Sequence, residues 1–271
     1  MQTLRSPPVA DIVYPVVIRA LKLGFTGLRI RFQISGTEKV PAQGGLVLAS
    51  NHVSYLDFIF AGLATWHGRR RLTRFMAKDA VFTHRVSGPL MRGMHHIPVD
   101  RESGSASFRA ALKALKAGEI VGVFPEATIS QSFTVKELKS GAVRMAASAR
   151  VPLLPVVVWG GQRMWTKGRP RSFPRRQTIT IIVGDPMTVS PQDDMDAATT
   201  QLRETLAALL AQAQAAHPAS ADPGPHAWWL PAHLGGSAPT PQEAARIAAD
   251  EAVQRRTRRA ARDQPGGPQA T

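Results

Sequence analysis

Residues 46 to 57 read LVLASNHVSYLD. The stretch begins with an apolar run, residues 46–49, and continues into polar residues that include His52 and Asp57. A short apolar run that ends in polar residues predicts a buried strand, then a turn and a helix. His52 would then lie at the carboxyl end of the strand, which is the edge where open α/β sheets place their ligand sites.

Short apolar runs and helical patterns continue to alternate along the chain. The runs expected to be strands are 46–49, 74–77, 97–99, 120–124, 153–158 and 178–183. The stretches with helical periodicity are 55–66, 81–91, 105–116, 136–150 and 195–215. This order predicts the α/β class, with a mixed central sheet covered by helices.

Composition divides the chain into three expected parts. Residues 1–35 form an N-terminal amphipathic segment, in which apolar residues at helical spacing stand beside basic ones. That pattern fits a helix in a bilayer interface, and it equally fits a helix packed on the domain with a solvated basic face. Residues 36–215 hold the strand and helix pattern. Residues 216–271 are expected to be a flexible Pro/Gly-rich linker followed by a basic helical tail, with helical periodicity over 242–262.

The charge of the chain indicates anionic partners. The formal net charge is +15 for 271 residues, with a sequence pI near 11.3, so the surface attracts nucleic acid, anionic bilayers or phosphorylated substrates. Nucleic-acid binding is not expected, because no aromatic stacking platform or recognition helix accompanies the basic tail. The absence of cysteine excludes disulfides, thiolate metal sites and an acyl-cysteine intermediate.

Membrane attachment, if it occurs, is expected to be at the surface. No apolar run approaches the roughly 18 to 20 residues of a membrane-spanning helix, and no signal-peptide pattern is present. The expected location is therefore the cytoplasmic face of a membrane, with the protein peripheral or monotopic.

His52 and Asp57 can act together only in one local geometry. On a continuous helix they would be about 140° apart, so contact requires His52 in the loop and Asp57 in the first helical turn. The carboxylate would then orient the imidazole, leaving the other ring nitrogen as a general base. The alternative is that Ser50 or Asn51 caps the helix and His52 is an ordinary edge residue.

Further polar groups follow the later strands. Residues 93–101 read GMHHIPVDR and end in Arg101, residues 123–130 read VFPEATIS and contain Glu126, and residues 151–158 read VPLLPVVV. No G-x-S-x-G elbow surrounds a serine, which argues against a serine hydrolase. A metal site is not expected either, since the adjacent histidines 95 and 96 would point to opposite faces of a strand.

Taken in order, the four blocks NHVSYLD, GMHHIPVDR, VFPEATIS and VPLLPVVV resemble the glycerolipid acyltransferases that include bacterial 1-acyl-sn-glycerol-3-phosphate acyltransferase. The resemblance spans about residues 36–189. It implies that His52 is the base and Asp57 its partner, that Lys78 and Arg101 contact the acceptor phosphate, and that Glu126 takes part in acceptor binding.

The resemblance also implies an activity and its partners. The expected protein is a membrane-associated O-acyltransferase of phospholipid biosynthesis, with its acyltransferase domain over 36–215. It would move a fatty acyl chain from acyl-CoA or acyl-carrier protein to a lysophosphatidic acid-type acceptor in an anionic membrane, without a cofactor or a metal. The sequence predicts no oligomeric state.

Two departures from the family pattern leave the acceptor open. The third block commonly reads FPEGTRS, whereas this chain has Ala127 and Ile129 in place of the glycine and the arginine. Lys136, Lys139 and Arg144 lie just downstream and are candidates to replace the lost cation. The alternatives are an acyltransferase of the same fold that uses glycerol 3-phosphate, a lysophospholipid or a glycolipid, and a non-catalytic lipid-binding protein.

Overall fold

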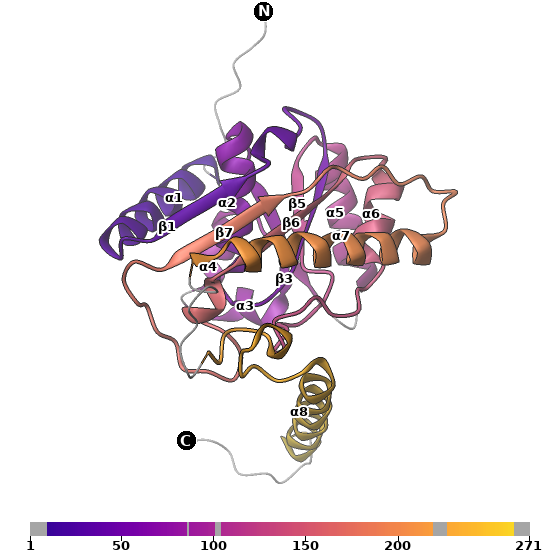
Figure 1. Cartoon of the computed structure of the whole chain (residues 1–271). Helices are drawn as coiled ribbons and strands as arrows, with labels where there is room; N and C mark the ends of the chain where they lie inside the picture. Colours follow the sequence, from indigo (N-terminus) through magenta and orange to yellow (C-terminus); the bar gives the residue numbers. More distant parts are fainter. Residues whose placement is uncertain (1–9, 86, 101–103, 219–226, 263–271) are drawn as a thin grey trace, which may run out of the picture.

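The structure is a computed structural model that describes residues 10–85, 87–100, 104–218 and 227–262 (Figure 1). The strands are β1 (Arg31–Ser35), β2 (Leu46–Ser50), β3 (Thr73–Lys78), β4 (Ile97–Val99), β5 (Ile120–Val123), β6 (Leu153–Trp159) and β7 (Thr178–Val183). The helices are α1 (Ala10–Gly27), α2 (Asp57–Arg69), α3 (Asp79–Thr83), α4 (Ser87–Gly93), α5 (Gly104–Lys116), α6 (Gly141–Ala149), α7 (Met195–Ala216) and α8 (Pro241–Arg262).

The strands form one seven-stranded sheet in the order β1-β7-β6-β2-β5-β3-β4. β6 and β7 are antiparallel, and the other neighbouring strands are parallel. The predicted α/β class with a mixed sheet is therefore confirmed. Because β6, β2, β5, β3 and β4 run in the same direction, the residues that follow them meet at one edge of the sheet.

Alternate residues of β2 build the two faces of the core. Val47 and Ala49 pack with α5, α6 and α7 on one face, whereas Leu46 and Leu48 pack with α2 on the other. All five residues of β2 are buried, as expected for a central parallel strand covered on both sides.

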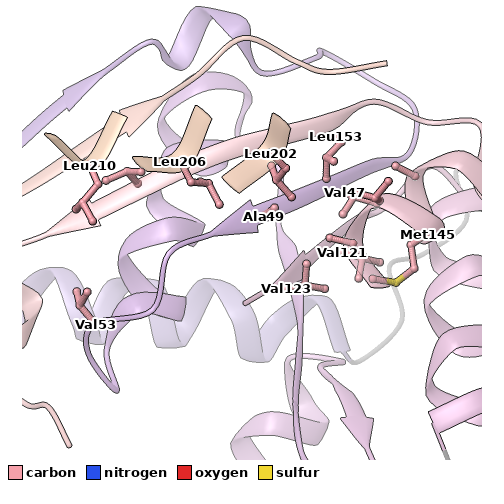
Figure 2. Packing of buried hydrophobic residues seen from close by; sticks show 14 of the residues in the cluster. Val47, Ala49, Val53, Val121, Val123, Met145, Leu153, Leu202, Leu206 and Leu210 are labelled. Carbon is pink, nitrogen blue, oxygen red and sulfur yellow. The ribbon is translucent and has the colours of Figure 1, made fainter. Parts of the chain in front are cut away.

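Helix α7 crosses the sheet and supplies a row of leucines. Leu202, Leu206 and Leu210 are buried and point at the residues of β2 and β6 below them (Figure 2). The helix expected over 195–215 is therefore confirmed, and its leucines at a spacing of four residues share the face that packs on the sheet.

β1 was not predicted, and it extends the sheet into residues 31–35. It pairs in parallel with β7 along its whole length and has an alternating exposed and half-buried pattern. The sheet thus begins before residue 36, inside the segment that we expected to be separate from the domain. An edge strand of five residues directly after a helix leaves too short an alternation to stand out in the sequence.

Helix α1 packs on the body of the protein through one face. Ile18 is buried, and the Tyr14 hydroxyl donates a 2.7 Å hydrogen bond to the Thr73 carbonyl. An apolar cavity of about 180 Å³ lies between α1, α2, β3 and α4. The other face of α1 leaves Val16 and Leu23 exposed. None of the helices in the described part of the chain combines the length and apolar content needed to cross a bilayer.

Two expected helices differ from the structure. The predicted helix 136–150 begins only at Gly141. Residues 136–140 instead run along the loop after β5, where the Lys136 N–H bonds to the Glu126 side chain and the Lys139 N–H to the Pro125 carbonyl. The predicted helix 81–91 is divided into α3 and α4. Pro89, in the first turn of α4, has no N–H with which to continue a helix from α3.

Part of the expected linker belongs to the core. Ala227, Trp229, Leu230 and Ala238 are buried in the same cluster as the α7 leucines. The domain boundaries remain predictions, but residues 227–238 do not behave as a solvated linker. Helix α8 follows this segment and projects from the edge of the molecule (Figure 1).

Candidate active site

His52 and Asp57 meet at the carboxyl end of β2. The strand ends at Ser50, His52 lies in the turn, and Asp57 is the first residue of α2. His52 Nδ1 is 3.1 Å from Asp57 Oδ2. This is the loop-to-helix geometry that contact between the two residues requires.

The Asp57 carboxylate also fixes the backbone of the turn. Its Oδ2 accepts hydrogen bonds of 2.7 Å from the N–H groups of Val53 and Ser54, in addition to the contact with His52. Burial raises the pKa of Asp57, whereas the hydrogen bond and charge of His52 and the two backbone donors lower it. One oxygen therefore orders the ring and the turn that carries it.

The remainder of the His52 ring is packed on one face and partly exposed. It stacks on Phe124 with ring centroids 4.2 Å apart, and its side chain is 19% exposed. Within the described residues, Nε2 makes no hydrogen bond. Since Asp57 engages Nδ1, Nε2 is the nitrogen that can exchange a proton with a bound molecule.

Glu126 lies in the loop after β5 and bonds to the backbone of His52. The His52 N–H donates to Glu126 Oε1 at 2.8 Å, and the Ser130 N–H donates to the His52 carbonyl at 2.7 Å. The second oxygen of Glu126 accepts from the Lys136 N–H at 3.3 Å. Burial raises the pKa of Glu126 to about 7, with hydrogen bonds and nearby Lys136 opposing the shift. This geometry suits a positioning role, and the expected role in acceptor binding remains a prediction.

Ala127 adopts a backbone conformation that favours glycine. Its φ is +60°, in the left-handed region, where a Cβ is strained. The position is the one at which the resembled family commonly has glycine. The turn geometry therefore accounts for the usual glycine, and this chain forms the turn with alanine.

Lys78 lies at the same edge of the sheet as His52. It ends β3 and is exposed, and its register partner in β4 is Val99. One strand, β5, separates β3 from β2, which corresponds to about 10 Å between the strand ends. Arg101 lies outside the described residues, so the structure places four of the five predicted site residues.

The lost arginine of the third block has a partial substitute. Ile129 is 7% exposed, so its side chain belongs to the core. Of the downstream cations, Lys136 reaches back to this loop, where its Nζ bonds to the carbonyl and hydroxyl of Thr128. Lys139 and Arg144 are exposed, and Arg144 bonds to Ser140.

A segment after β6 supports the turn from the other side. The Ser54 hydroxyl donates to the Trp165 carbonyl at 2.7 Å, and the Thr166 hydroxyl donates to the Val53 carbonyl at 2.7 Å. Asn51 is buried and bonds through its amide to the backbone of Val158. These partners are more than a hundred residues apart in sequence, and no spacing rule predicted them.

The arrangement provides an oriented base with a cationic residue nearby. Among the described residues, no group of three or more histidines and carboxylates is placed to hold a metal ion. The chemistry available is proton transfer at His52 Nε2, next to a group that can bind an anion.

Comparison with known proteins gives a consistent family. The family model described as Acyltransferase matches residues 31–159. The chain is 31% identical over 179 residues to 1-acyl-sn-glycerol-3-phosphate acyltransferase of Bacillus subtilis, which covers 65% of this chain and 82% of that protein. It is 28% identical to the protein of that name from Limnanthes douglasii, of which the match covers 64%, less than two thirds.

A solved structure shares the fold. The crystal structure of the 1-acyl-sn-glycerophosphate acyltransferase from Thermotoga maritima matches with a TM-score of 0.60 at 21% identity, covering 76% of this chain and 78% of that one.

Proposed function

This chain belongs to the acyltransferase family, and from that membership we propose that it moves a fatty acyl group from a thioester donor to the free hydroxyl of 1-acyl-sn-glycerol 3-phosphate. The observation that carries the proposal is the contact between His52 Nδ1 and Asp57 Oδ2 at the carboxyl end of β2. It leaves Nε2 of an oriented imidazole at the edge of the sheet where Lys78 also lies.

The reaction proceeds by direct transfer. His52 Nε2 takes the proton of the acceptor hydroxyl as that oxygen attacks the thioester carbonyl. The tetrahedral intermediate collapses with cleavage of the carbon–sulfur bond, and the imidazolium returns the proton to the leaving thiolate. Asp57 stabilises the imidazolium and keeps Nε2 directed at the substrates. No acyl-enzyme forms, and the site supplies mainly proximity and base catalysis.

Lys78 and Arg101 are assigned to the acceptor phosphate. Lys78 is exposed at the end of β3, about two strand spacings from His52, so a phosphate there would leave the glycerol hydroxyl within reach of the base. Glu126 is assigned to positioning, because both of its oxygens accept backbone N–H groups of the site.

The protein is proposed to act at an anionic membrane surface through α1. Val16 and Leu23 are exposed on this helix, together with the basic residues Arg19 and Lys22. Flotation with phosphatidylglycerol vesicles tests this. Leu23→Ser should weaken vesicle binding, whereas Val253→Ser, at another exposed apolar residue in α8, should not.

Release of free thiol tests the activity. The full chain, detergent-solubilised lysophosphatidic acid and palmitoyl-CoA should yield CoA thiol, and His52→Ala should abolish it. His67→Ala is the matched control, because His67 is exposed in the last turn of α2. Full activity of His52→Ala would show that the assigned base is wrong. Lipid binding without thiol release from any acceptor would favour a non-catalytic binding protein.

A second acceptor class is favoured by one observation. Ile129 is buried where the family commonly has an arginine, so this loop presents one cation fewer to a phosphate. Glycerol 3-phosphate, a lysophospholipid and a glycolipid should therefore be assayed beside lysophosphatidic acid with one donor. Faster thiol release with any of them would replace the proposed acceptor.

A further inference from the structure

A second group of cationic side chains lies beside the turn that carries His52. A cavity of about 190 Å³ is bounded by the loop after β5, the segment after β6 and the segment that precedes α8. Its polar lining comes from Gln131, Lys167 and Arg169, with the Trp228 ring on another wall. Two cations, an amide and an indole at one small cavity are typical of a site for a phosphorylated organic group.

The two segments that supply the polar lining of the cavity also bond to the turn that carries His52. Gln131 directly follows Ser130, whose N–H bonds to the His52 carbonyl. Lys167 directly follows Thr166, whose hydroxyl bonds to the Val53 carbonyl. Consecutive Cα atoms are about 3.8 Å apart. Gln131 and Lys167 are therefore each one residue away from a residue that bonds to the turn.

The side chains at the cavity are held in place. Lys167 forms an ion pair with Glu251 of α8, and the Arg169 guanidinium lies over the Trp228 ring, 5.0 Å from its centroid. Lys136 adds a third nearby cation. Burial lowers its pKa, Glu126 raises it, and Lys167 lowers it, so Lys136 and Lys167 are close enough to interact.

This site is separate from the one assigned to the acceptor. Lys167 and Arg169 follow β6, which is adjacent to β2 on one side, whereas Lys78 ends β3, which lies beyond β5 on the other side. His52 therefore lies between two cationic regions. A transfer reaction with two anionic substrates needs such a division, because each substrate must direct its reacting group at the base from its own side.

We propose that the cavity lined by Gln131, Lys167, Arg169 and Trp228 binds the phosphate of the thioester donor. This assignment rests on the proposed function. The phosphate can come from the pyrophosphate of CoA or from the phosphodiester of the pantetheine arm on a carrier protein. In both donors the phosphate is linked by the pantetheine arm to the sulfur that leaves at His52.

Steady-state kinetics of the full chain tests the assignment. Lys167→Gln and Arg169→Gln should each raise KM for palmitoyl-CoA about tenfold, the effect of one charge-assisted hydrogen bond, with kcat and the acceptor KM unchanged. Arg175→Gln, which removes an exposed charge from the same segment, should change neither KM. Glu251→Gln breaks the same ion pair as Lys167→Gln but keeps the cation, so the donor KM should not rise.

Two probes give a readout without turnover. By calorimetry the unaltered protein should bind 4′-phosphopantetheine about tenfold more tightly than pantetheine, and Lys167→Gln should remove the difference. Palmitoyl-carrier protein distinguishes the two phosphate sources: a loss with both donors assigns the pantetheine phosphate, and a loss with palmitoyl-CoA alone assigns the CoA pyrophosphate.

The failures of the two proposals are distinguishable. Equal affinity for the two probes combined with an unchanged KM for palmitoyl-CoA in Lys167→Gln and Arg169→Gln, or a rise in the acceptor KM instead of the donor KM, would overturn the donor site. Turnover with an unchanged donor KM in Lys167→Gln and Arg169→Gln would refute the donor site but not the proposed function. Binding of 4′-phosphopantetheine without acyl transfer to any acceptor would refute the proposed function but not the phosphate site.

Discussion

Replacement of Ala127 by glycine should stabilise the protein. Ala127 has a φ of +60°, and the left-handed conformation costs an L-residue about 1 to 2 kcal/mol through the clash of Cβ with the carbonyl oxygen. Glycine removes that strain but loses more conformational entropy on folding, about 0.5 to 1 kcal/mol. The free energy of unfolding of Ala127→Gly should therefore rise by up to about 1.5 kcal/mol, with a central value of about 0.75 kcal/mol.

The same substitution in a helix should have the opposite effect. Ala208 is exposed in the interior of α7, where glycine is less favourable than alanine by about 1 kcal/mol. Urea unfolding followed by circular dichroism measures both variants against the unaltered chain. A loss of stability in Ala127→Gly as large as that in Ala208→Gly would refute the left-handed turn next to Glu126.

Other perturbations follow from the site and the core. Asp57→Asn should lower kcat by two orders of magnitude or more in the thiol assay, because the imidazolium loses its carboxylate. Lys78→Met should raise KM for lysophosphatidic acid about tenfold but leave KM for monoacylglycerol unchanged, if its target is the phosphate. The raised pKa of Glu126 makes the folded state bind the proton more tightly than the unfolded state, so the contribution of this group to stability is fully present below about pH 4.5 and is lost as the pH rises through about 7. That contribution amounts to roughly 3 kcal/mol, and urea unfolding at a series of pH values should show Glu126→Gln without this slope. Leu206→Ala should cost about 2 to 5 kcal/mol in the same unfolding measurement, since this leucine is fully buried between α7 and the sheet.

The sequence predicted those features that depend on local pattern. The apolar run before His52 indicated β2, and the spacing from His52 to Asp57 set the geometry that their contact needs. The helical periodicity of residues 195–215 indicated α7. Each of these rests on periodicity or on residues a few positions apart.

Features that depend on distant partners were not predictable in this way. Residues 136–140 have a helical pattern, but they are not helical, and the N–H groups of Lys136 and Lys139 bond to Glu126 and Pro125 of the loop after β5, so tertiary contacts override the local preference. Trp229 stands in a Pro/Gly-rich stretch, yet it is buried in the core. The support of the His52 turn by Thr166 has no signal in either local sequence.

Glu126 and Ser130 both bond to the backbone of His52, and they lie at the two ends of one short loop. The residues at its two ends fix the base, through a side chain at one end and a main-chain N–H at the other. Residues 127–129 between them form none of these bonds. Because Ile129 is buried and Ala127 has a left-handed backbone, substitutions intended to change the acceptor should begin at the exposed Thr128, where the bonds that position His52 stay intact.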